Sequence, residues 1–181
     1  MINPHRASSF YGSMDFFLND AIRKATSTPI SFSNGWRWGG AIPKGKLTLR
    51  DLYTIVPMDP VIMTAKLTGK EIIELLEENI ENTFACDAFN QKGGYLKRNS
   101  GLKIYFKIEN PYGQRIQKIF VGNDLLDSDK IYEVAYITVQ AVPKNVGSDH
   151  KSTDIKSIEA MIQLLREGPY TRQDMESYIA I

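Results

Sequence analysis

Hydrophobic residues recur at two different spacings along the chain. Spacings of three and four residues predict amphipathic helices, at residues 13–25, 69–81 and 154–167, with a short helix after Thr48. Alternating or dense apolar residues predict strands, at residues 30–33, 61–67, 102–108, 115–121 and 131–139. Helices and strands are mixed, and residues 102–121 have the pattern of an antiparallel hairpin. The sequence therefore predicts an α+β domain whose mixed sheet has an antiparallel portion and is packed by helices.

Capping residues mark where the helices begin. Thr48 with Asp51, and Thr68 with Glu71, have the spacing of a capping box, in which the two side chains bond each other's backbone N–H groups. Ser13 is expected to cap the first helix. The helix after Thr68 has an acidic face that we expect to be solvated, formed by Glu74, Glu77, Glu78 and Glu81. Residues 144–154 are expected to form a loop, and residues 171–181 a short terminal helix.

Composition limits the domain count and the chemistry. The 181 residues are 43% hydrophobic, which suits one domain over 1–181 with a core that needs no disulfide; the single cysteine allows no intramolecular one. A net charge of +1 gives no general attraction to nucleic acid or to anionic lipid, so neither partner is expected. No apolar run is long enough to span a membrane, and residues 1–13 lack the pattern of a signal peptide, so the compartment is not predicted.

The first candidate binding segment places both tryptophans around one arginine. It runs from Asn34 through Gly35, Trp36, Arg37 and Trp38 to two further glycines. The planar guanidinium of Arg37 suits phosphate, sulfonate or carboxylate, and an indole can stack on a flat ligand. The alternative is a tight turn whose tryptophans fill the core and whose arginine pairs with an acid.

The second candidate segment is rich in glycine and basic residues. Gly93 and Gly94 precede Tyr95, and Lys92, Lys97 and Arg98 lie close by. Such a loop can present an aromatic ring to a ligand, but it lacks the spacing of a Walker phosphate loop. The alternative is a loop that enters the hairpin with a tyrosine packed against the core. The two histidines, His5 and His150, are expected to face solvent.

Several separated segments resemble the C-terminal, substrate-binding domain of the 5′-nucleotidase family. The matching stretches, in chain order, are the leading helix at 13–25, Asn34-Gly35-Trp36-Arg37, Pro43-Lys44-Gly45-Lys46-Leu47-Thr48, Asp51-Leu52-Tyr53, Val56-Pro57-Met58, Leu67-Thr68-Gly69-Lys70-Glu71-Ile72, Gly93-Gly94-Tyr95-Leu96, Ser100-Gly101-Leu102 and Ile131-Tyr132-Glu133-Val134-Ala135. The resemblance covers about residues 6–142, and residues 143–181 are expected to add a loop and terminal helices.

The resemblance assigns roles to two residues. It implies that Arg37 contacts the anionic or ribose side of a substrate, and that Tyr95 is one of two aromatics that sandwich the base. The second aromatic is expected at Val139, and the family's Gly-Gly-Asp-Gly motif falls near residues 143–146. At both places the sequence departs from the nucleotide-binding pattern of the family. In these departures, and in residues 36–39, 82–84 and 89–94, the chain is similar to the thiohydrolase branch of the family, which removes sulfate from a cysteine thiosulfonate.

The function implied is substrate recognition without catalysis in this chain. The family's two catalytic metals lie in a metallophosphoesterase domain. The metal-ligand motifs of that domain need more histidines than the two that this sequence contains. That domain is therefore expected to be absent from residues 1–181, with divalent metals only in a separate domain or chain and no cofactor here. The expected ligand is small and anionic or nucleotide-like, bound by Asn34, Trp36, Arg37, Trp38, Gly94 and Tyr95. The alternative is a non-enzymatic protein-interaction module on the same fold.

Overall fold

The structure is a computed structural model, which describes residues 9–35, 42, 45–172 and 176–181. Its helices are α1 (Ser13–Thr26), α2 (Leu49–Ile55), α3 (Gly69–Phe84) and α4 (Ser157–Arg166), with a 3-10 turn η1 (Ala88–Asn90). Its strands are β1 (Ile30–Ser33), β2 (Val61–Thr68), β3 (Arg98–Ser100), β4 (Leu102–Phe106), β5 (Ile116–Val121), β6 (Asp124–Leu125), β7 (Ile131–Tyr136), β8 (Ser148–Lys156) and β9 (Tyr178–Ala180).

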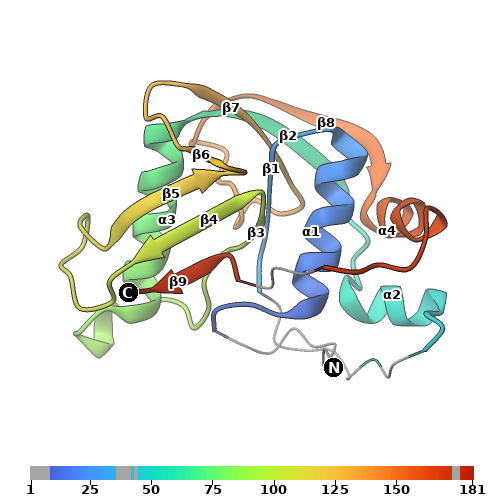
Figure 1. Cartoon of the computed structure of the whole chain (residues 1–181), viewed down its shortest axis with the longest axis horizontal. Helices are drawn as coiled ribbons and strands as arrows, with labels where there is room; N and C mark the ends of the chain where they lie inside the picture. The colour runs from blue at the N-terminus through green and yellow to red at the C-terminus, as the bar shows by residue number, and fades with distance from the viewer. Residues whose placement is uncertain (1–8, 36–41, 43–44, 173–175) are drawn as a thin grey trace.

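These strands form two mixed sheets (Figure 1). The larger sheet has the order β3-β1-β7-β2-β8 and the smaller one the order β6-β5-β4-β9. Strand β1 runs parallel to β7 and antiparallel to β3, while β4 and β5 form the antiparallel hairpin that the alternation predicted. The predicted α+β class is confirmed, and β7 lies in the middle of the larger sheet.

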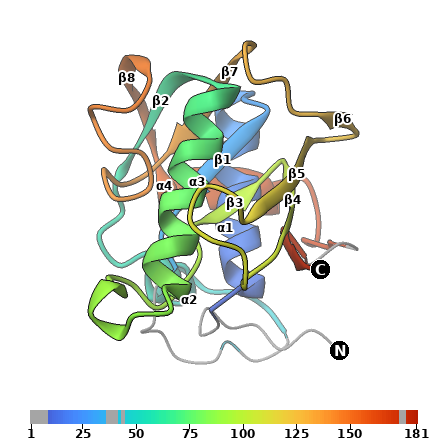
Figure 2. The same cartoon turned by 90° about the vertical axis from the view of Figure 1, so that its left-hand side faces the viewer.

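Helices cover both faces of the larger sheet. On one face, α3 packs against apolar side chains of both sheets, including Phe32, Leu67 and Phe106, and Figure 2 shows this helix running across the sheets. On the opposite face, α1, α2 and α4 form a second core with Ile62 and Ala135 of the sheet. Burial on both faces explains why all four residues of β1 are buried.

The predicted helix starts are confirmed at two of three positions. Both capping boxes form, at Thr48 with Asp51 and at Thr68 with Glu71. The prediction for Ser13 was wrong, because Gly12 is the cap residue, no side-chain cap bond forms, and Ser13 is buried in the first turn.

Three predictions of irregular or helical structure were also wrong. Edge strand β8 takes residues 148–154 from the expected loop and residues 155–156 from the expected start of the last helix. This strand pairs with β2 and is exposed along much of its length, so it lacks the apolar alternation by which strands are detected. Residues 178–180 form β9, parallel to β4, instead of a helix. Arg98, expected to lie in the loop around Tyr95, opens strand β3, whose three residues are buried. Strands this short depend on tertiary pairing, which no local pattern encodes.

The acidic face of α3 is not uniformly solvated. Glu77 is 4% exposed, and its carboxylate accepts hydrogen bonds from the backbone N–H of Ile116 at 2.6 Å and of Gly113 at 3.2 Å. Glu81 pairs with the buried Arg115 at 2.7 Å. Helical spacing alone cannot show that the β4–β5 hairpin folds against this face.

Gly69 and Gly101, which belong to the motifs of the family resemblance, lie where another backbone segment approaches very closely. A Cβ at Gly101, whose φ is +93°, would lie 2.0 Å from the carbonyl oxygen of Pro29. A Cβ at Gly69 would lie 2.1 Å from the carbonyl oxygen of Asp127. The chain passes from the larger to the smaller sheet at Gly101, so this approach sets how the sheets join.

In the part of the chain that the structure describes, no helix combines the length and the apolar character needed to cross a membrane.

Replacing Glu77 by alanine is expected to lower the free energy of unfolding by about 2–3 kcal/mol, because hydrogen bonds to a charged group are lost and two backbone donors remain without this acceptor. Glu74→Ala is the control, since Glu74 is exposed on the same helix, and it should change stability by less than about 0.5 kcal/mol. Chemical denaturation measures both, and equal effects would contradict the assigned role of Glu77.

Candidate functional site

A cavity of about 400 Å³ lies beside the end of β1 and joins the two segments that the sequence singled out. Its polar lining comes from Asn34 after β1, from Glu78, Asn79 and Asn82 on α3, from Lys92, Tyr95 and Lys97 in the loop before β3, and from Gln140 after β7. Asn34 and Tyr95 are far apart in the sequence, so only the fold brings them to one cavity.

Helix α3 positions the Tyr95 loop through its last two turns. The backbone carbonyl of Asn82 accepts hydrogen bonds from the N–H groups of Lys92 and Gly93, at 2.9 and 3.0 Å. Asn79 accepts from the Lys97 N–H at 2.6 Å, and the Thr83 hydroxyl donates to the Tyr95 carbonyl at 3.2 Å. The loop is thus held by a helix end whose carbonyl groups have no intrahelical partner.

Gln140 connects the other two walls of the cavity. Its side-chain oxygen accepts from the buried Asn34 amide, and its backbone carbonyl accepts from the ammonium group of Lys97. The end of β1, the Tyr95 loop and the segment after β7 are therefore held together by one residue.

Arg98 lies next to the cavity residue Tyr95 and is almost completely buried. Its Nε atom is 2.9 Å from an Asp15 carboxylate oxygen, and the two side chains are 3% and 2% exposed. Burial lowers the pKa of the Arg98 guanidinium, and the charge of Asp15 opposes that shift. The guanidinium also lies 5.9 Å from the centre of the Tyr95 ring, and a Cβ at Gly35 would come within 2.8 Å of it. One ion pair therefore supports both the Asn34–Gly35 turn and Tyr95.

Lys97 supplies a titratable positive charge to the cavity. Burial lowers the pKa of its ammonium group from 10.5 to about 8, and the nearby Glu78 carboxylate opposes that shift. A lysine with this pKa is mostly charged at neutral pH and loses its charge in the mildly alkaline range.

The donor set of the cavity suits binding. Its amide residues, the tyrosine and the two lysines, which line the cavity beside Glu78, can recognise a polar, partly flat and anionic molecule. Among residues 9–35, 42, 45–172 and 176–181, no three His, Cys, Asp or Glu side chains are grouped so that they could hold a metal ion. The described side chains therefore do not fit the two-metal centre that the resemblance implies for a separate domain.

Comparison with known proteins decides the family. The model of the 5′-nucleotidase C-terminal domain matches residues 11–141. The chain belongs to this family. Two curated relatives from Bacillus subtilis (strain 168) are similar to it: the trifunctional nucleotide phosphoesterase protein YfkN, 26% identical over 118 residues, and the endonuclease YhcR, 31% identical over 70 residues. These matches cover 62% and 39% of this chain.

Solved structures share the fold of this 5′-nucleotidase C-terminal domain. The sulfate thiohydrolase SoxB of Thermus thermophilus, in complex with glycerol, superposes with a TM-score of 0.86 at 24% identity. A 5′-nucleotidase precursor, also from Thermus thermophilus, gives a TM-score of 0.79 at 20% identity. Each of these two structures covers 99% of this chain. This chain spans 34% of the SoxB chain and 38% of the 5′-nucleotidase precursor. It spans only 8% of YfkN and 6% of YhcR.

The predicted site residues of this 5′-nucleotidase C-terminal domain have different outcomes. Asn34 and Tyr95 line the cavity, while Gly94 is half-buried and Gly93 lines the wall instead. Trp36, Arg37 and Trp38 lie outside the described residues, so their roles stay predictions. Val139, at the expected place of the second aromatic, is 55% exposed and is not among the lining residues.

The sequence missed Lys97 and Gln140 as cavity residues, and it misplaced His150. Lys97 was visible only as local positive charge, and Gln140 had no signal because its role depends on the path of the chain after β7. His150 was expected to face solvent, but it is half-buried, 2.8 Å from the Tyr136 hydroxyl and 3.0 Å from the Val146 carbonyl. These bonds tie the end of β7 to the start of β8.

Arg98→Met is expected to lower the free energy of unfolding by about 3–5 kcal/mol, because it leaves the Asp15 carboxylate buried without this cation. The double variant Asp15→Leu/Arg98→Met should recover part of that loss, since no isolated charge remains buried. Chemical denaturation of the three proteins measures the difference. A double variant less stable than Arg98→Met alone would contradict the dominance of this ion pair.

Proposed function

We propose that this chain is the substrate-recognition domain of a 5′-nucleotidase-like hydrolase. In this proposal, a nucleotide or a related anionic ester or thiosulfonate binds in the cavity between Asn34 and Tyr95, and the catalytic metals belong to a metallophosphoesterase domain outside residues 1–181. The observation that carries the proposal is that this cavity unites the Asn34 turn with the Tyr95 loop, two separate motifs of the family resemblance.

The chemistry of the cavity supports a ligand with a flat part and a charged part. Tyr95 offers an aromatic face, while Asn79, Asn82 and Gln140 lie close by as sources of amide or carbonyl groups. Lys97 supplies positive charge at neutral pH. A volume of about 400 Å³ lies within the usual range for small-molecule sites.

The two ligand classes differ in how much they depend on Tyr95. A nucleotide needs an aromatic surface for its base, and Val139 offers none opposite Tyr95. A thiosulfonate has no base and needs only cationic and hydrogen-bonding groups. SoxB is named a sulfate thiohydrolase and the second solved structure a 5′-nucleotidase precursor, so both classes belong in the test.

Tyr95→Ala is expected to weaken binding of nucleoside monophosphates by roughly tenfold to a hundredfold, because stacking on an aromatic ring contributes about 1–3 kcal/mol per base. Isothermal titration calorimetry of the purified chain with AMP, UMP and thiosulfate measures this effect. Tyr112→Ala is the matched control, since Tyr112 is 59% exposed in the β4–β5 turn. Thiosulfate binding that is unaffected by Tyr95→Ala, without nucleotide binding, would support the thiosulfonate class.

No binding of any of these anions to the wild-type chain would contradict the proposed recognition role. An equal loss in Tyr95→Ala and Tyr112→Ala would contradict the assignment of this cavity.

Affinity for an anionic ligand is expected to fall as the pH rises through about 8, the pKa of Lys97. Below this value the ammonium group is charged and attracts the ligand, and above it the group is neutral. Lys97→Gln should remove this pH dependence, whereas Lys118→Gln, at an exposed lysine of β5, should retain it. A wild-type affinity that stays constant from pH 7 to about 9 would contradict a role for Lys97 in binding the anion.

A further inference from the structure

Three elements of the fold meet at Lys97. Its backbone N–H donates to the Asn79 side chain of α3 at 2.6 Å, and its ammonium group donates to the backbone carbonyl of Gln140, after β7. Both partners line the candidate cavity. The backbone carbonyl of Lys97 accepts a third hydrogen bond, at 2.8 Å, from the hydroxyl of Tyr178 in β9. This donor comes from the C-terminal end of the chain and is not among the lining residues.

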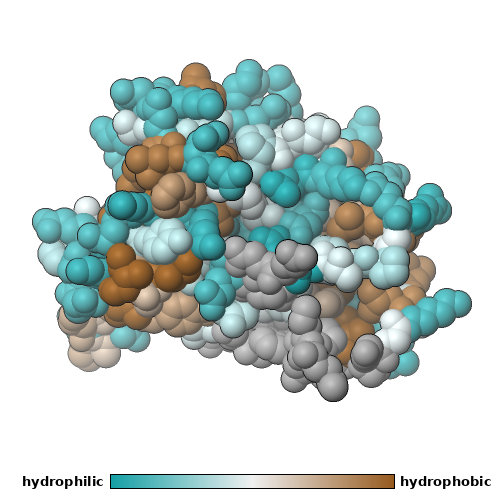
Figure 3. Space-filling model, viewed as in Figure 1, coloured by the Kyte–Doolittle hydropathy of each residue, from teal (hydrophilic) through white to brown (hydrophobic). Residues whose placement is uncertain are grey.

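Strand β9 places the ring of Tyr178 in the core. The strand runs parallel to β4, and side chains alternate between the two faces along a strand. Ile179 therefore lies on the outer face of the smaller sheet, where Figure 3 shows hydrophobic side chains over the strands. Tyr178 points inward: it is 3% exposed, and its ring packs edge-on against Phe106, with 6.1 Å between the ring centroids. Its hydroxyl thus reaches Lys97 from the core.

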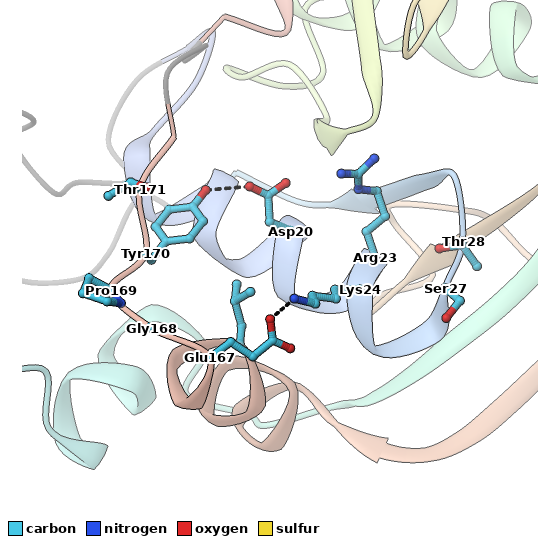
Figure 4. A pocket seen from close by; sticks show the side chains of 11 residues that line it. Asp20, Arg23, Lys24, Ser27, Thr28, Glu167, Gly168, Pro169, Tyr170 and Thr171 are labelled. Carbon is cyan, nitrogen blue, oxygen red and sulfur yellow. Dashed lines mark hydrogen bonds and ion pairs between the residues drawn. The ribbon is translucent and has the colours of Figure 1, made fainter.

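The segment that leads to β9 is attached to helix α1. After α4, Glu167 forms an ion pair with Lys24, and the Tyr170 hydroxyl donates to Asp20 at 2.7 Å, as Figure 4 shows. Arg172 donates to the same Asp20 carboxylate at 2.6 and 2.8 Å. Beyond these contacts the chain pairs with β4. The position of β9 is therefore fixed by contacts that do not involve Lys97.

The Tyr178 hydroxyl is a donor throughout the pH range in which Lys97 titrates. Burial raises the pKa of this hydroxyl, and the positive charge of Arg98 opposes that shift. The pKa of Lys97 is about 8. The proton that bonds the Lys97 carbonyl is therefore retained while the ammonium group loses its charge. Other charged or titratable groups near Lys97 are not altered by a change at Tyr178; they are Glu78, Lys92, Tyr95 and Arg98.

We propose that Tyr178 is a positioning residue of the candidate site: its hydroxyl fixes the backbone at Lys97 so that the ammonium group stays at the cavity, against Gln140, where it binds an anion. The binding of an anion rests on the proposed function, whereas the placement of the lysine does not. Without the hydroxyl, the Lys97 carbonyl loses this donor, the backbone at this residue shifts, and the ammonium group moves toward water.

Tyr178→Phe tests the proposal, because it removes the hydroxyl and keeps the ring that packs against Phe106. The pKa of Lys97 is measured in the ligand-free chain by NMR of ¹³C-labelled lysine side chains, with Lys97→Gln to assign the signal. It should rise from about 8 toward 10.5 in Tyr178→Phe, because the ammonium group gains contact with water. The affinity for AMP, UMP or thiosulfate at neutral pH, measured by calorimetry, should fall roughly threefold to tenfold.

Tyr136→Phe is the matched control. Tyr136 is 2% exposed, and its hydroxyl also makes a hydrogen bond of 2.8 Å, to His150. The two variants therefore remove the same group from equally buried positions. Tyr136→Phe should leave both the pKa of Lys97 and the affinity for the anion unchanged.

The pKa of Lys97 separates this proposal from the proposed function. An unchanged pKa in Tyr178→Phe would overturn the positioning role, and so would an equal shift in Tyr136→Phe. A shifted pKa with an unchanged affinity would overturn the role of Tyr178 in binding. If the wild-type chain binds none of the three anions, the proposed function fails, and the pKa measurement still decides whether Tyr178 positions Lys97.

Discussion

The buried ion pair of Asp15 and Arg98 is the constraint on which the candidate site depends. Both side chains are almost fully buried, so each charge is tolerable only because the other is present. Asp15 stands in the first turn of α1 and Arg98 opens β3, and the pair therefore fixes the start of a helix against the edge of the larger sheet. The Gly35 backbone and the Tyr95 ring both lie against the same guanidinium. The distance between the two walls of the cavity is thus set by a group that no ligand needs to touch.

Helix α3 makes three separate sets of polar contacts along its length. At its N-terminus the capping box fixes where the helix leaves β2. In the middle, Glu77 binds the backbone of the β4–β5 hairpin, and at the C-terminal end Asn79, Asn82 and Thr83 hold the Tyr95 loop. On the polar side of this helix, Glu77 and Glu81 are therefore structural, whereas Glu74 and Glu78 are exposed. The position of the hairpin and the position of the loop are linked through one rigid element.

Much of this architecture could be predicted from the sequence, because local physics encodes it. Capping boxes at Thr48 and Thr68, the apolar face of α3 and the alternation in β4 depend on residues close together in the chain. What the sequence missed depends on distant contacts: β8 and β9 exist through pairing with β2 and β4, and Glu77 is buried by a hairpin that begins beyond residue 100. The candidate site divides in the same way. Glycines before an aromatic marked the Tyr95 loop, whereas Lys97 and Gln140 became cavity residues only through the path of the chain after β7.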